Sequence, residues 1–309
     1  MTGHHGREAA SHRPSSPLQE LEPSPVDSPA DHQDEEYFHP KDAPSYPKSS
    51  SSLGLSGHNA IYYLTRIQRY SSYTFSAFLT FHITNTSIIP LVTRSVPASD
   101  PYLLLTRPYY QSPIAEPLVV FLPLVAHVGS GIALRIYRQR QRAKRYGAPS
   151  STDRKQLAWP QPSGTSKLGY ALTSLVSVHV LANRIVPLWV EGGSSGIDLS
   201  YVSHAFAKYP ISANIAYGVF VGIACWHFTW GWLKWLGLDP AQAATGAVDK
   251  ARVRKRRWYQ VNAASAALAL VWMAGGLGIV GRGGAVGGWI GREYDELYRK
   301  TPLIGSLIS

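Results

Sequence analysis

Residues 211–236 read ISANIAYGVFVGIACWHFTWGWLKWL, and this stretch decides the fold class. Its only charged side chain is Lys234, close to the end. About 20 residues of α-helix, at about 1.5 Å per residue, cross the roughly 30 Å hydrocarbon core of a bilayer. We therefore predict that this stretch is a transmembrane helix.

Four further apolar runs have a similar length. They read YSSYTFSAFLTFHITNTSIIPLV (70–92), PLVVFLPLVAHVGSGIALRIY (117–137), LGYALTSLVSVHVLANRIVPLWV (168–190) and WYQVNAASAALALVWMAGGLGIV (258–280). A soluble domain with five buried core helices is the alternative, but such runs joined by arginine-rich connectors are rare in soluble folds. The sequence therefore predicts an all-α integral membrane protein with five transmembrane helices.

The N-terminal part of the chain differs in composition from the rest. Residues 1–50 carry nine acidic and four basic side chains, and the region is rich in proline and serine. Such a segment buries too little apolar surface to offset the entropy of ordering. We predict a disordered tail over 1–58 and a multi-pass membrane domain over 59–309. The first 50 residues contain no apolar signal-peptide core, so we expect insertion through the internal helices.

Positive charge gathers in two connectors between the apolar runs. One connector, 138–167, holds eight Lys and Arg residues, and the segment 250–257 holds six. With five helices, both lie on the same side of the membrane as the N-terminus. The positive-inside tendency places that side in the cytosol and the C-terminus across the membrane. Because the charge flanks membrane spans, we expect no nucleic-acid partner.

Two pairs of segments indicate an internal repeat. FHITNTSIIPLV at 81–92 matches VHVLANRIVPLW at 178–189, since each histidine is followed by Ile, Pro and Leu at the sixth, eighth and ninth positions. AHVGSG at 126–131 matches WHFTWG at 226–231, with glycine four residues after the histidine. We predict two tandem helical hairpins that form a four-helix bundle, with a fifth helix beside it.

Four histidines lie near the middle of the first four runs, one in each. They are His82, His127, His179 and His227. Imidazole in hydrocarbon is unfavourable unless it is paired, so histidines at this depth are candidate functional residues. Because their depths match within a repeat, we expect them to converge on one layer of the bundle. Equivalent residues, His82 with His179 and His127 with His227, are the natural pairs, but the sequence does not choose the pairing.

Three interpretations of these histidines stay open at this point. Facing histidines bind the iron of haem b axially, and Gly131 and Gly231, one turn after a histidine, would leave room for the flat macrocycle. Alternatively, the histidines are hydrogen-bonding residues that join helices, and the glycines allow close packing. A zinc site of four histidines is the third interpretation, and it is disfavoured at mid-membrane.

Other residues carry weaker signals. The glycine-rich stretch 275–288 is either a close-packing face or, after Arg282, a flexible exit from the membrane. We expect His204 to be a surface residue and Arg184 to extend to the membrane interface. The sequence contains no phosphate loop, paired-carboxylate site or Ser/His/Asp set, so we do not expect an enzyme.

Three segments resemble a fungal family, the mitochondrial outer-membrane adaptor called MDM-ten-complementing protein one. They are YYLTRIQRYSSYTFSAFLTFHITNTSIIP (62–90), AHVGSGIALRIYRQRQ (126–141) and WHFTWGWLKWLG (226–237), and the likeness covers roughly 60–300. The hairpins also resemble the cytochrome b anchor subunits of succinate dehydrogenase, through His127 followed by Gly131. The stretch 66–69 lacks the histidine that those subunits place before their arginine.

The family resemblance implies a multi-pass protein of the mitochondrial outer membrane with its C-terminus in the intermembrane space. It implies an adaptor that recruits a bridge-like lipid-transfer protein of the Vps-thirteen class to contact sites and supports mitochondrial lipid homeostasis. Recruitment in such adaptors uses a Pro-x-Pro peptide, and the candidate here is Leu21, Pro23 and Pro25, with Pro44 to Pro47 as the alternative. Such a peptide suits strand addition or polyproline recognition. Besides this protein, membrane lipids are expected partners. The alternative function is a redox membrane protein with b-type haem or quinone.

Overall fold

The computed structural model describes residues 60–145, 152, 159, 161–243, 249–302 and 304–308, all in the unit Gly57–Ser309. These residues form helices and connecting turns, and none of them is in a strand. The predicted tail over 1–58 lies outside the described residues.

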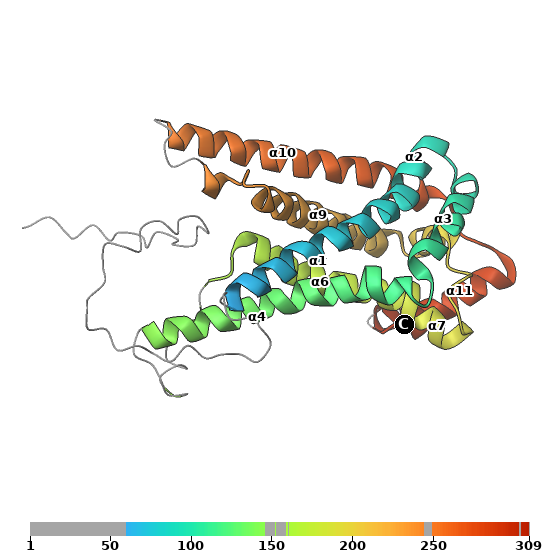
Figure 1. Cartoon of the computed structure of the whole chain (residues 1–309). Coiled ribbons are helices and arrows are strands. Elements are labelled where there is room, and N and C mark those ends of the chain that lie inside the picture. The colour runs from blue at the N-terminus through green and yellow to red at the C-terminus, as the bar shows by residue number, and fades with distance from the viewer. Residues whose placement is uncertain are drawn as a thin grey trace, which may run out of the picture. The chain divides into compact units, whose positions relative to one another are not determined.

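Five of the described helical segments are long and apolar enough to cross a membrane, as predicted. They are Ala60–Thr93, Glu116–Ala143, Gly164–Glu191, Pro210–Gln242 and Lys250–Arg282. Only 17–33% of each apolar window is buried, whereas the core helices of a soluble domain would be largely buried. The main α-helices of the spans lie side by side in Figure 1 and are α1 (Ala60–Ile83), α4 (Leu122–Arg145), α6 (Gly164–Val180), α9 (Pro210–Trp235) and α10 (Lys250–Gly276).

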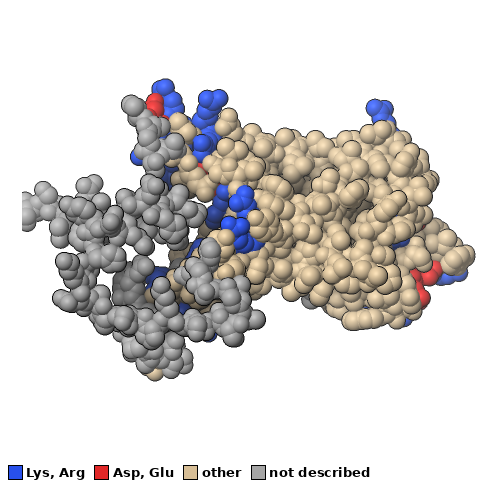
Figure 2. Space-filling model, in the orientation of Figure 1, with Lys and Arg blue, Asp and Glu red and all other residues tan. Residues whose placement is uncertain are grey.

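Several helices extend beyond the apolar runs because their charged ends continue the helix. The last turns of α4 carry Arg138, Arg140 and Arg142, and α10 begins with Lys250 and a series of arginines. Figure 2 shows Lys and Arg side chains gathered at this end of the described helices. We call it the basic end, and the opposite end is the one where α1 and α6 finish.

The repeat predicted from the sequence extends to the backbone. The π-helical turns η1 (Thr84–Ile88) and η3 (Leu181–Ile185) each begin two residues after a repeat histidine. Each is followed by a short helix, α2 (Ile89–Thr93) or α7 (Val186–Glu191), with proline in its first turn. A proline there has no N–H to donate, and a π turn relieves the hydrogen-bond ladder before it.

Each hairpin packs on itself, and the fifth helix joins one side. The closely packed pairs of long helices in the described chain are α1 with α4, α6 with α9, and α9 with α10; α10 also packs on η1. The core between α6, α9 and α10 contains Leu172, Val221 and Trp272. Ser87 Oγ in η1 donates to the carbonyl oxygen of Trp272 at 2.6 Å. The fifth helix therefore joins the two hairpins.

Three shorter helices cover the opposite end, and the sequence analysis missed them. They are α3 (Val96–Gln111), α8 (Leu199–Lys208) and α11 (Gly288–Lys300), followed by α12 (Ile304–Ile308). Ser95 caps α3, and Asp198 caps α8 by accepting from Tyr201 N at 2.8 Å. Because α3 and α11 are too polar to span a bilayer and α8 is too short, they instead fold onto the helix ends.

Candidate functional site

The structure brings the four histidines together as the two pairs expected from the repeat. The ring centres of His82 and His179 are 5.8 Å apart, with an angle of 77° between the ring planes. Those of His127 and His227 are 6.2 Å apart, at 85°. Each pair therefore joins the first hairpin to the second.

The pair nearer the basic end is held by matching hydrogen bonds. His127 Nδ1 lies 3.1 Å from the carbonyl oxygen of Gln68 on α1, and His227 Nδ1 lies 3.1 Å from that of Thr165 on α6. A carbonyl oxygen only accepts, so each Nδ1 carries the hydrogen and each Nε2 is unprotonated. Within the described chain, neither Nε2 has a hydrogen-bond partner.

The second pair lies among aromatic rings. His82 stacks on Phe78 at 5.7 Å between ring centres, and His179 lies 5.4 Å from the ring of Phe220. His179 Nδ1 is 3.4 Å from Asn183 Nδ2, whose stronger contact, 2.8 Å, is to the carbonyl oxygen of His179 itself. This pair therefore has a less polar surrounding and weaker orienting bonds than the other.

The histidines occupy two layers rather than the single layer predicted from sequence. Gln68 and Thr165, which lie beside the His127–His227 pair, each come 14 residues before His82 or His179 on the same helix. At about 1.5 Å per residue, the layers are roughly 21 Å apart. The prediction of a single layer was wrong because it took the middle of each apolar run as the middle of the membrane. The depth of a residue is instead set by how the antiparallel helices are offset along their axes.

The two layers also bear on zinc. Among the described residues, no group of three or more His, Cys, Asp or Glu side chains is placed to hold a metal ion. The zinc interpretation required all four histidines at one point, and the structure separates them into pairs. Hydrogen bonding between helices and haem ligation both remain compatible with facing pairs.

The glycines near the histidines have different surroundings. A Cβ added at Gly131 would lie 2.8 Å from Gln68 Nε2, whereas one added at Gly231 would meet no atom within 4 Å. The sequence analysis missed Gly169 on α6, where a Cβ would lie 2.8 Å from Cε1 of His227. Gly169 therefore lets the His227 ring approach the α6 backbone.

Comparison with known proteins supports the resemblance seen in the sequence. Residues 174–285 match the family model described as MDM10-complementing protein 1, transmembrane domain. This stretch is therefore similar to that family's transmembrane domain. No curated protein and no solved structure matched the chain. The family is one of mitochondrial membrane proteins.

The region that matches the family model begins within α6 and covers the rest of the second hairpin and the fifth helix. It contains His179 and His227 but not their partners His82 and His127. Those partners lie in the first hairpin, which repeats the second in its histidines and its π turn. Each histidine pair therefore joins one histidine inside the region that matches the family model to one histidine outside it.

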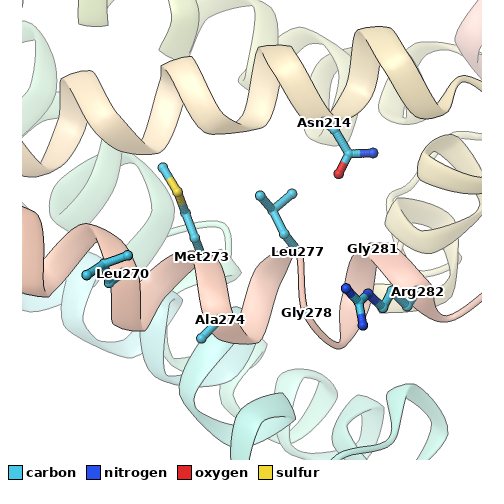
Figure 3. Close-up of a pocket in the computed structure, with 8 residues that line it drawn as sticks. All are labelled: Asn214, Leu270, Met273, Ala274, Leu277, Gly278, Gly281 and Arg282. Carbon is cyan, nitrogen blue, oxygen red and sulfur yellow. The ribbon is translucent and has the colours of Figure 1, made fainter.

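The matched region also contains a groove between α9 and α10, with a volume of about 610 Å³. Its lining residues are Asn214, Leu270, Met273, Ala274, Leu277, Gly278, Gly281 and Arg282. Figure 3 shows Met273 and Leu277 pointing from α10 toward α9, with Asn214 and Arg282 at one end. Within the described chain, the guanidinium of Arg282 has no acidic partner. The groove is thus apolar along its length. Its cationic group, Arg282, lies at the end of the bundle opposite the basic end.

Arg184 does not extend to the interface alone, as the sequence analysis expected. Its Nε donates to Glu116 Oε1 at 2.7 Å, and its Nη2 donates to Glu116 Oε2. Arg107 donates to the carbonyl oxygens of Ser194 at 2.9 Å and Ser195 at 3.4 Å. Burial lowers the pKa of Arg107, with the nearby Arg184 acting in the same direction. Two arginines are therefore fixed beside each other at the opposite end.

His204 is a buried residue of α8, which corrects the prediction of a surface residue. Its Nδ1 accepts from Val286 N at 2.9 Å, and its Nε2 lies 3.2 Å from Asp295 Oδ1 on α11. Lys208 also donates to Asp295. The sequence contains no local signal for this contact, since His204 and Asp295 are 91 residues apart.

The predicted partner-binding residues Leu21, Pro23 and Pro25 lie outside the described residues, as do Pro44 to Pro47. The prediction that they bind a partner therefore rests on the sequence.

Proposed function

We propose that this protein is an adaptor of the mitochondrial outer membrane that recruits a bridge-like lipid-transfer protein of the Vps-thirteen class to organelle contact sites. Such recruitment would support mitochondrial lipid homeostasis. The observation that carries the proposal is the match to the MDM10-complementing protein 1 transmembrane domain. The Pro-x-Pro peptide in the N-terminal segment supplies the partner-binding element.

The architecture suits an anchor. Five apolar spans hold the domain in the bilayer, and an odd number puts the two chain ends on opposite sides. The peptide would bind its partner by strand addition or as polyproline, with Leu21 as a side-chain anchor next to Pro23 and Pro25. In this proposal the histidine pairs are not required for recruitment.

The recruitment proposal is tested by replacing Pro23 and Pro25 together with alanine in the full-length protein. The partner should no longer collect on mitochondria, whereas membrane insertion should be unchanged, because the substitutions lie outside the five spans. Fluorescence imaging of the tagged partner and carbonate extraction of the adaptor measure the two quantities. The matched control is Pro44→Ala with Pro47→Ala. Loss of recruitment in the control variant alone would show that Pro44 to Pro47, and not Pro23 to Pro25, bind the partner.

We also propose that the groove between α9 and α10 holds one acyl chain of a phospholipid, with the phosphate at Arg282. Leu270, Met273 and Leu277 provide an apolar wall, and an unpaired guanidinium suits a phosphate oxygen. Arg282→Gln should reduce the anionic phospholipid that stays bound through purification, as measured by native mass spectrometry. Arg292→Gln, an exposed arginine of α11, is the control. Equal lipid retention in both variants would exclude this site.

A further inference from the structure

We propose that each histidine pair is a bis-histidine site for one b-type haem, so that the domain holds two haems at two depths. One site is His127 with His227, near the basic end, and the other is His82 with His179. The proposal is independent of the adaptor function, which needs neither pair.

The separation of the rings fits ligation of one metal atom between them. Two imidazoles that share a metal, each with a metal–nitrogen distance of about 2 Å, have ring centres roughly 6 Å apart. The observed separations are 5.8 Å and 6.2 Å. Edge-to-face contacts between rings span about 4.5–7 Å as well, so the hydrogen bonds of the rings decide between the two interpretations.

The hydrogen bonds of the first pair leave the ligand nitrogen available. A metal-binding histidine usually donates its second ring N–H to a carbonyl or carboxylate, which fixes the tautomer and the ring orientation. The Nδ1 atoms of His127 and His227 contact the carbonyl oxygens of Gln68 and Thr165, each at 3.1 Å. Each Nε2 therefore carries the lone pair that iron requires.

The helices that carry the facing histidines are not packed closely against each other across the two hairpins. In the part of the chain that the structure describes, neither α1 with α6 nor α4 with α9 is a closely packed pair, although these helices carry the facing histidines. Gly231, one turn after His227, meets open space where its side chain would be. The helices that pack closely are those within each hairpin.

Cationic side chains lie beyond each pair, where the two carboxylates of a haem need partners. On α1, Arg66 and Arg69 flank Gln68 at the basic end, and both are exposed. At the opposite end, Arg184 follows His179 by five residues but already pairs with Glu116, which leaves the neighbouring Arg107 as the available cation. Arg107 bonds backbone carbonyls rather than a carboxylate.

A bound haem would supply one-electron redox chemistry. The chain's own residues would set its properties: His82 and His179 in aromatic surroundings of low polarity, His127 and His227 with hydrogen-bonded rings nearer the interface. Because burial and hydrogen bonding to the axial ligands tune the potential of a haem, we expect the two sites to have different midpoint potentials.

The proposal is tested on the full-length protein purified gently from haem-replete cells. We expect a Soret band that shifts on reduction and two haems per chain by the pyridine haemochrome assay. Replacing His127 and His227 together with alanine should leave one haem, and so should replacing His82 and His179 together. His227→Met, which keeps an axial ligand, should retain two haems and raise one midpoint potential.

A glycine pair separates haem loss from misfolding. Gly169→Ala should displace the His227 ring and alter only the spectrum and potential of the site near the basic end. Gly222→Ala, on α9 with no atom within 4 Å of the added carbon, should change nothing. A correctly inserted, thermally stable wild-type protein without a Soret band would overturn the proposal. One haem in the wild type, lost with one pair and insensitive to the other, would overturn the second site.

Discussion

At the scale of single residues, the closest approaches in the domain depend on glycine. A Cβ at Gly275 would lie 2.0 Å from the carbonyl oxygen of Ser87, and one at Gly276 would lie 1.8 Å from Tyr217 Oη. The sequence left this stretch open between a packing face and a flexible exit. Before Arg282 it is a packing face, and Gly283 is also packed, since a Cβ there would lie 2.7 Å from Val96 Cγ2. Composition alone does not distinguish the two roles because glycine serves both.

Gly275→Ala should destabilise the domain, because the added carbon overlaps η1 and disturbs the Ser87–Trp272 hydrogen bond. Overpacking of this kind costs about 1–3 kcal/mol. The measurement is the unfolding free energy, or the thermal midpoint, of the purified domain in detergent. Gly218→Ala on α9, where no atom lies within 4 Å of the new carbon, should be neutral or stabilising. Equal stability of the two variants would contradict the close contact between α10 and η1.

At the scale of elements, the sequence predicted the long helices well and the short ones not at all. The apolar runs identify spans because each carries its own signal over about 20 residues. For α3 and α8 the only local signals were capping residues, Ser95 followed by proline and Asp198 before an apolar segment. Their packing depends on distant residues, such as Asp100 Oδ1 accepting from Leu199 N at 2.9 Å. Such contacts leave no pattern in a single sequence.

The docking of α11 on α8 should depend on pH. Burial raises the pKa of Asp295, but hydrogen bonds from Lys208 and His204 outweigh this and lower it below the ordinary value of 3.8. A lowered carboxyl pKa stabilises the fold above the unfolded value, and this contribution is lost as the pH falls through the folded value. Asp295→Asn should therefore reduce the thermal midpoint at pH 7, and the difference from wild type should be lost as the pH falls below 3.8 and through the lowered pKa of Asp295.

The control for this prediction is Glu296→Gln on the same helix. Glu296 pairs with Lys300 at 2.7 Å, and both side chains are about half exposed. Exposed pairs contribute little and are screened by salt, so this variant should remain close to wild type at 150 mM salt. A larger effect for Glu296 than for Asp295 would show that α11 is held by its own surface charges rather than by α8.

At the scale of the whole molecule, the five spans and the concentration of positive charge at one end predict the orientation. In the sequence, fourteen Lys and Arg residues lie in the segments 138–167 and 250–257. On intact mitochondria, added protease should remove an N-terminal tag and spare a C-terminal one. Permeabilising the outer membrane with digitonin should then expose the C-terminal tag. Loss of both tags without permeabilisation would contradict an odd number of spans.

The sequence identified the candidate site but not its layout. One histidine per helix, repeated in two hairpins, made His82 with His179 and His127 with His227 the natural pairs, but the sequence could not choose the pairing. The depth of each pair could not be predicted from the sequence, because it depends on how the antiparallel helices are offset along their axes. Gly169 was missed because its role depends on a contact with His227, which lies on another helix.

The facing of equivalent residues has a consequence for the ancestry of the domain. When His82 meets His179, a residue meets its own counterpart, as happens on the two-fold axis of a symmetric dimer. The bonds from His127 to α1 and from His227 to α6 repeat each other about the same axis. A gene for one hairpin would have built both histidine pairs by self-association. Duplication and fusion of that gene would place the two copies in one chain, and α10, which contacts α9 and η1, would make their surroundings unequal.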